Sequence, residues 1–171
     1  MQKIVITYGV IAGLVIICSG IASIALGVAS MWSGFLVMIV AFSAIFVAIR
    51  QYRDQALGGV IKFSTAALLG LGIVAIASIV YVIVWEIYIH ATDFSFMDQY
   101  ANAILDDKKA AGVSGPEWDA LVKEMEQMNS SYRNPLVRLP MTFLEVFPIG
   151  LLIALLSAAM LRNSHKTPEA R

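Results

Sequence analysis

The sequence predicts an all-α integral membrane protein, in which four transmembrane helices form a bundle and an amphipathic helical hairpin lies outside the membrane between the third and fourth. Of the 171 residues, 59% are hydrophobic and 14% are charged, with a mean hydropathy of +0.78. Ordinary soluble domains are roughly 45 to 50% apolar. Apolar runs of ~20 residues, each long enough to cross a bilayer, fill most of the chain. We therefore expect residues 1–171 to form a single membrane domain, with no separate soluble enzyme domain.

Four runs meet the length and hydropathy criteria for transmembrane helices, at about residues 4–29, 31–49, 65–91 and 139–161. The first run is too long for the apolar region of a signal peptide, which is typically about 7 to 15 residues, so we expect it to be retained. The short connection "SMWSG" makes the first two runs an antiparallel hairpin.

The basic residues beside these runs predict the orientation of the chain. With four crossings, seven of them fall on one face, which the positive-inside rule makes cytoplasmic together with both termini: Lys3, Arg50, Arg53, Lys62, Arg162, Lys166 and Arg171. The long loop, residues 92–138, carries eight acidic and five basic residues. We expect this loop outside the inner membrane, which means the periplasm if the source is a Gram-negative bacterium.

The long loop has the pattern of two amphipathic helices. Apolar residues recur at helical spacing from Phe96 to Ala111, and Gly112 supplies a stop. Ser114 can cap a second helix and complete a capping box with Glu117, and Asn134-Pro135 ends the hairpin before the last span. The hairpin can pack on the outer ends of the spans, lie in the membrane interface, or bind a ligand or partner.

Small residues recur along three of the spans, where another helix backbone can approach closely. They are Gly9, Gly13, Gly20 and Gly27 in the first, Ala66, Gly70 and Ala77 in the third, and Gly150, Ala154 and Ser157 in the fourth. These seams suit either internal packing or association with a second copy or another membrane protein. The lipid bilayer itself is the other expected partner.

Two acidic residues, Glu86 and Glu145, interrupt the third and fourth spans. Counted from the expected span ends, each lies roughly 7 to 9 Å inside the outer boundary. His90 is four residues after Glu86, on the same helix face, and Arg138 starts the fourth span. Because an ionised carboxylate is costly inside a bilayer, these residues form the candidate site.

Three interpretations of this candidate polar cluster remain open. The carboxylates can fasten the third and fourth helices by bonding to neighbours, among them Arg138, Tyr81, Trp85, Tyr88 and Thr142. They can instead form a proton or cation site, with one of the two protonated. A metal site of Glu86, His90 and Glu145 is the third interpretation, although no further strong ligand is evident.

The sequence lacks the motifs of common catalytic and cofactor sites. There is no nucleotide-binding glycine loop, Ser/His/Asp set or zinc motif, and Cys18 is the single cysteine. Twelve basic and twelve acidic residues leave no net charge to attract nucleic acid. We expect no bound cofactor or metal and a non-enzymatic structural, accessory or envelope-sensing role. The alternative is a small proton- or cation-coupled transporter or channel subunit that uses Glu86 and Glu145.

Three segments, "RQYRDQALGGVIKFSTA", "IVYVIVWEIYIH" and "NPLVRLPMTFLEVFPIGLLIALLSA", together resemble a bacterial membrane family known as domain of unknown function 4199. The likeness covers nearly the whole chain. The resemblance implies a small four-helix protein of the bacterial inner membrane without an assigned activity, and it gives no residue a catalytic role. The matching residues are Tyr52, Arg53, Asp54, Gly58 and Gly59 in the cytoplasmic loop, with Trp85, Glu86, Asn134, Pro135, Arg138, Glu145, Pro148 and Gly150.

Overall fold

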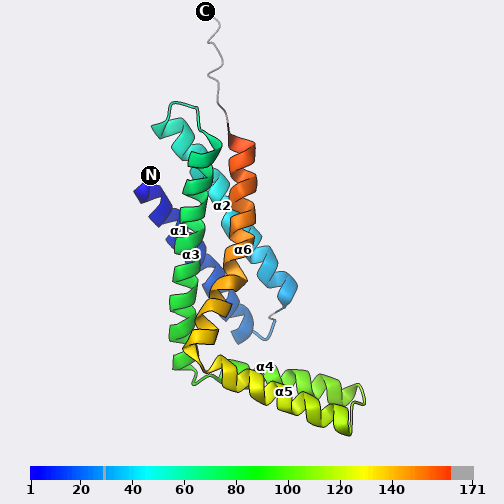
Figure 1. The fold of residues 1–171 in the computed structure, drawn as a ribbon. Helices are drawn as coiled ribbons and strands as arrows, with labels where there is room; N and C mark the ends of the chain where they lie inside the picture. The colour runs from blue at the N-terminus through cyan, green and yellow to red at the C-terminus, as the bar shows by residue number, and fades with distance from the viewer. Residues whose placement is uncertain (29, 163–171) are drawn as a thin grey trace, which may run out of the picture. The chain divides into compact units, whose positions relative to one another are not determined.

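The structure is a computed structural model, which describes residues 1–28 and 30–162 (Figure 1). Within these ranges the chain forms helices and no strand, which confirms the predicted all-α class. The six helices are α1 (Gln2–Ala25), α2 (Met31–Ala56), α3 (Phe63–Ala91), α4 (Ser95–Ala110), α5 (Pro116–Tyr132) and α6 (Pro135–Leu161). Four of them, α1, α2, α3 and α6, are long and apolar enough to cross a membrane.

Helix α1 ends at Ala25, four residues before the expected end of the first span. Gly27 has a φ of +67°, a left-handed conformation that glycine adopts without a steric penalty. The N–H groups of Gly27 and Val28 donate to the carbonyls of Ile24 and Ser23. These hydrogen bonds cap the C-terminus of the helix. Residue 29, the expected last residue of the span, lies outside the described residues.

Helix α2 continues to Ala56, beyond the end expected at residue 49. Its N-terminus is capped by Ser30, whose hydroxyl accepts the Ser33 N–H at 3.1 Å. The extra turns are polar, with an ion pair of 2.7 Å between Arg53 and Asp54. Hydropathy ends a predicted span where polar residues begin, whereas the hydrogen bonds of the helix continue past that point.

Helix α6 begins at Pro135, four residues before the expected start of the fourth span. Proline is favoured at the first helical position because its missing N–H has no partner there in any case. The side chain of Asn134 accepts the Leu136 N–H at 3.0 Å and so caps the helix. The helix then continues through Pro140 and Pro148.

The chain divides into two compact units, Met1–Ile83 with Phe143–Arg171, and Val84–Thr142. In the first unit, glycines let helices approach closely. A Cβ on Gly13 would lie 2.7 Å from the Ala77 carbonyl oxygen, and one on Gly150 would lie 2.7 Å from a Val74 methyl carbon. The helices α1 and α6 therefore both pack against α3 at positions where a larger residue would not fit.

Of the small-residue stripe expected along α1, only Gly9 and Gly13 pack against another helix among the described residues. Gly9 and Gly13 both face α3, where a Cβ would meet Ile76 and Ala77. Among the described residues, none from another helix comes within 4 Å of the position that a Cβ on Gly20 would take. Gly27 follows the end of the helix. Gly9 and Gly13 therefore pack closely against α3. Association of the stripe beyond Gly13 with a second copy or another membrane protein stays a prediction.

In the second unit, α4 and α5 run antiparallel and side by side (Figure 1). Met97 and Ala101 from α4 and Met125 from α5 are buried. Helix α4 ends as predicted, since Gly112 has a φ of +85° and its N–H donates to the Lys109 carbonyl.

The predicted capping box at the start of α5 is wrong. Gly115 is the N-cap, no side chain caps the helix, and Pro116 takes the first helical position. Ser114 therefore stands one residue too early. In a capping box the acidic partner lies three residues after the N-cap, so Glu117 is one residue too close to Gly115.

Candidate functional site

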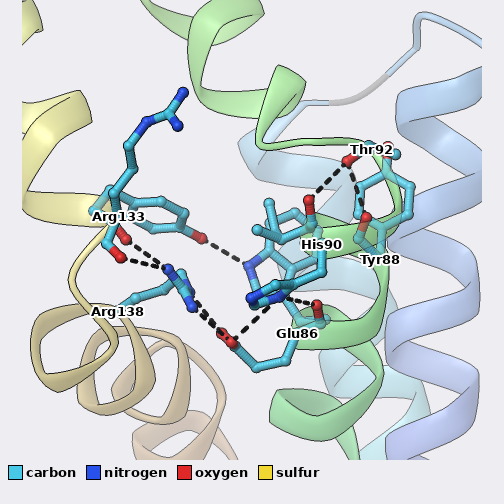
Figure 2. A network of polar contacts seen from close by, with 9 residues as sticks. Glu86, Tyr88, His90, Thr92, Arg133 and Arg138 are labelled. Atoms are coloured by element: carbon cyan, nitrogen blue, oxygen red, sulfur yellow. Dashed lines mark hydrogen bonds and ion pairs between the residues drawn. The ribbon is translucent and has the colours of Figure 1, made fainter.

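The first of the two predicted acidic residues, Glu86, is bound by an arginine. Glu86 lies five residues before the end of α3, and Arg138 is in the first turn of α6. Arg138 Nε donates to Glu86 Oε1 at 2.6 Å, and Nη2 donates to Oε2 at 2.7 Å (Figure 2). Two parallel charge-assisted hydrogen bonds are the strongest form of arginine–carboxylate pair.

Arg138 also binds the end of α5. Its Nη1 donates to the backbone carbonyls of Tyr132 at 2.9 Å and Arg133 at 3.2 Å. These carbonyls lie at the C-terminus of α5, where carbonyl oxygens have no partner within the helix and carry partial negative charge. With its side chain 1% exposed, Arg138 joins the end of α3, the end of α5 and the start of α6.

Aromatic rings surround this ion pair. The Arg138 guanidinium lies 5.0 Å from the ring centre of Phe94 and 5.8 Å from that of Tyr132. Trp85 Nε1 donates to the Tyr132 hydroxyl at 2.7 Å, and the Trp85 ring meets Phe96 edge-on at 5.1 Å. The rings exclude water from the guanidinium and add cation–π attraction.

The connection between α3 and α4 has an unusual backbone. Asp93 and Phe94 have φ values of 50° and 61°, in the left-handed region that non-glycine residues seldom occupy. Phe94 lies against three neighbours, since Arg133 and Arg138 stack over its ring and His90 meets it at 5.3 Å. These contacts hold Phe94 in a conformation that costs about 1 to 3 kcal/mol.

His90 lies at the edge of this cluster rather than inside it. Its Nδ1 is 2.8 Å from the backbone carbonyl oxygen of Glu86 and 3.8 Å from Glu86 Oε2, and its side chain is 60% exposed. Among the described residues, no group of three His, Cys, Asp or Glu residues lies close enough to hold a metal ion. The interpretation of Glu86, His90 and Glu145 as a metal site therefore has no structural support.

The second acidic residue, Glu145, has different surroundings. The Tyr81 hydroxyl donates to its Oε1 at 3.4 Å, which is long for such a bond. Glu145 is exposed on α6, as are Leu144 before it and Pro148 after it. In the part of the chain that the structure describes, no ion pair joins Glu145 to a basic side chain.

The two acidic residues also differ in their positions along their helices. Glu86 is about 7.5 Å from the end of α3, in agreement with the sequence estimate. Glu145 is ten residues, about 15 Å, from the start of α6, because that helix begins earlier than expected. The two residues therefore lie at different distances from the ends of their helices, and the similar depth predicted for them inside a membrane stays a prediction. By the insertion scale, an ionised acidic group near the middle of a spanning helix costs about 3 kcal/mol.

The structure thus sorts the predicted site residues into two groups. Glu86, Arg138 and His90 are in direct contact, with Trp85 reaching the same cluster through Tyr132, and all belong to the unit Val84–Thr142. Tyr81 and Glu145 form a separate contact in the other unit.

Sequence reasoning missed three contributors to the arginine cluster, Phe94, Tyr132 and Arg133. Phe94 has no sequence signal, because its role depends on a left-handed backbone that is typical of glycine or asparagine. Tyr132 is one more apolar position at the end of α5 by its sequence, and the carbonyls of Tyr132 and Arg133 act irrespective of their side chains.

The loop motif around Tyr52 ends α2 and turns the chain toward α3. Arg53 Nε donates to Asp54 Oδ1 at 2.7 Å. Gly58 and Gly59 have φ values of 65° and 90°, and the Gly59 N–H donates to the Arg53 carbonyl at 2.9 Å. Positive φ at consecutive positions explains the paired glycines of the turn "LGGV".

Four membrane-type helices in an all-α chain, with an ion pair between Glu86 and the buried Arg138, place this protein in the class of multi-pass membrane proteins. The chain is a member of the family described as "Protein of unknown function (DUF4199)", whose profile matches residues 7–163. This match confirms the resemblance drawn from the sequence. No curated protein and no solved structure matches the chain.

Proposed function

We propose that this protein has a structural, accessory or envelope-sensing role in the bacterial inner membrane and is not an enzyme. The observation that carries the proposal is the use of Arg138, whose guanidinium makes four hydrogen bonds to Glu86 and to the end of α5. A buried cation that uses four of its five N–H donors in this way holds helix ends together. Glu86, the acidic residue best placed for chemistry at this end of α3, is neutralised by the same contact.

In this proposal the four spanning helices form a bundle, with both termini in the cytoplasm and residues 92–138 outside. The excess of acidic over basic residues in that loop, eight against five, supports this orientation, as do the basic residues beside the other ends of the spans. The test uses single-cysteine variants in a Cys18→Ser background. In intact cells an impermeant maleimide should label Lys109→Cys in the loop and not Gln55→Cys at the end of α2. The opposite pattern would overturn the orientation.

The arginine contact suggests how an external signal would reach the spans. Arg138 belongs to α6, binds Glu86 of α3, and holds the last carbonyls of α5. A molecule that binds the α4–α5 hairpin and displaces the end of α5 would remove two of these hydrogen bonds. Arg138, with the Trp85–Tyr132 hydrogen bond beside it, therefore couples the end of α5 to the adjoining ends of α3 and α6, which suits an accessory or sensing protein.

The experiment that tests the proposal combines two measurements on the full-length protein in lipid vesicles. Glu86→Gln should accelerate proteolytic cleavage of the α4–α5 hairpin, because Arg138 loses its counter-ion. Proton and cation flux should equal that of empty vesicles for both wild type and variant. Protein-dependent flux in the wild type that Glu86→Gln abolishes would contradict a structural role.

The alternative is a proton- or cation-coupled transporter or channel subunit that uses Glu86 and Glu145. One observation favours it, namely that Glu145 has a tyrosine partner and no basic one in the described chain. Because Arg138 already neutralises Glu86, Glu145 would be the group that carries the proton. Flux that Glu145→Gln abolishes, with Glu86→Gln unchanged, would support this alternative.

A further inference from the structure

Glu145 is an exposed acidic residue on the apolar, membrane-type helix α6, ten residues after the start of that helix at Pro135. We propose that it is the contact point for a transmembrane helix of another membrane protein, one that carries a lysine or arginine at the same depth. This partner contact rests on the accessory role proposed above, and it specifies an ion pair as the interaction through which the protein would bind its partner.

The residues around Glu145 show that its face of α6 is built for an apolar environment. Met141, Leu144 and Leu152 are 58%, 61% and 60% exposed. With Glu145 and Pro148 they follow the spacing of three and four residues that defines one helix face. Exposed leucines and methionines on a spanning helix face lipid or another helix. Glu145 belongs to this exposed face, and its carboxyl group also reaches the Tyr81 hydroxyl.

The contact that Glu145 makes within its own unit does not neutralise a charge. The Tyr81 hydroxyl is 3.4 Å from Oε1 and is neutral. The second carboxyl oxygen, Oε2, has no hydrogen bond recorded among the described residues. Ionisable groups inside membranes are almost always paired with an opposite charge or face an aqueous cavity. A basic partner on the exposed face would satisfy this requirement.

The chain's own basic residues make a second copy of this protein a poor source of that partner. The other basic residues lie near helix ends. Lys3 is in the first turn of α1, Arg50 and Arg53 are in the last two turns of α2, and His90 is next to the end of α3. Arg138, the remaining cation of the spanning helices, is buried and bonded to Glu86. If two copies associated through this face, the Glu145 carboxyl of one copy would meet either the Glu145 carboxyl of the other copy or apolar side chains. Charge complementarity favours a different protein.

Position along the helix favours a protein helix over a lipid amine. Glu145 lies about 15 Å along α6 from Pro135, and 16 residues from Leu161 at the other end. The hydrocarbon core is about 30 Å thick, and lipid headgroups lie outside it. A lysine or arginine on a neighbouring transmembrane helix can reach this depth.

The test uses the full-length protein in phosphatidylcholine vesicles with a donor dye on Cys18, the single cysteine, which is exposed. The probe is a leucine–alanine transmembrane peptide with one lysine near its middle and an acceptor dye. A second peptide with leucine in place of the lysine is the control. Energy transfer between donor and acceptor reports association of the peptide with the protein.

The wild type should bind the lysine peptide about tenfold more tightly than the leucine peptide, the scale of polar contacts between helices in membranes. Glu145→Leu should reduce this preference to less than about twofold, and Glu145→Gln should lower it substantially. Glu124→Gln, on the external hairpin, is the matched control and should keep the full preference. Should Glu145→Leu fail to fold, Glu145→Gln carries the test.

Three results would overturn the proposed contact. One is equal binding of the two peptides by the wild type, with no ion flux, which would remove this contact and leave the accessory role. A second is self-association of the protein that requires Glu145, which would assign the face to a second copy. The third is a proton or cation flux that Glu145→Gln abolishes, which would remove the accessory role itself.

Discussion

Glu86 and Glu145 interrupt similar apolar sequences, yet the structure treats them differently. Glu86 binds Arg138 through both oxygens, whereas Glu145 receives one long hydrogen bond from Tyr81. The Glu86 side chain is 22% exposed, and its surroundings are aromatic rings and helix ends. Glu145 is exposed among leucines. The comparison teaches that an acidic residue in a span is a structural element where the fold supplies a cation, and a candidate for outside contacts where it does not.

The largest expected loss of stability comes from replacing Arg138, the partner of Glu86. Arg138→Met should destabilise the protein by about 3 to 5 kcal/mol, because it leaves Glu86 charged without a partner and frees the carbonyls of α5. Denaturant unfolding of the full-length protein in detergent measures the change. Arg133→Met is the matched control, since Arg133 is exposed and stacks on Phe94 without a carboxylate. Equal losses for the two variants would show that the ion pair contributes little.

The next effect concerns the close packing of the other unit. Gly150→Ala should cost about 1 to 3 kcal/mol, because the added Cβ would overlap Val74 and Phe42. Gly20→Ala is the control, as no described residue of another helix lies near that position. The same unfolding measurement should show Gly20→Ala at or slightly above wild-type stability. An unchanged free energy of unfolding for Gly150→Ala would show that the contact between α6 and α3 does not require a glycine.

A double-mutant cycle sharpens the contrast between the two acidic residues. The loss caused by Arg138→Met should shrink when Glu86→Gln is added, because no unpaired charge then remains. The coupling energy should be about 0.5 to 3 kcal/mol, the range for residues in contact. The corresponding cycle between Arg138→Met and Glu145→Gln should give a smaller coupling, since Glu145 has no bond to Arg138. Equal couplings would mean that both acidic residues share the arginine.

The smallest expected effect is that of Glu145→Gln alone. Its unfolding free energy should stay within about 0.5 kcal/mol of wild type, as for substitutions away from buried networks. Gln retains a carbonyl oxygen that can accept from Tyr81. Thermal unfolding in detergent, beside Glu86→Gln as the comparison, measures the difference. A loss as large as that of Glu86→Gln would place Glu145 among the structural residues of the fold.

Hydropathy, together with the glycine and proline residues at helix ends, predicted most of the secondary structure. Each spanning helix was foreseen because an apolar run of that length has few other stable conformations. Gly112 and Asn134-Pro135 marked the helix ends of the hairpin correctly. The errors fall at helix ends. Helix α1 stops before Gly27, α2 and α6 continue into polar sequence, and Gly115 shifts the cap of α5. Hydropathy describes the preferred medium of a segment, and the hydrogen bonds of the helix do not end with it.

By itself the sequence determined the all-α class, four spans and the two acidic residues worth attention. Only the tertiary structure decided that Arg138, 52 residues away, belongs to Glu86, and that Tyr81 is the neighbour of Glu145. Composition and spacing record which groups a helix carries at each depth. They do not record the rotation of one helix about its axis relative to the next. That rotation depends on close contacts such as Gly150 against Val74 and on the left-handed turn at Phe94.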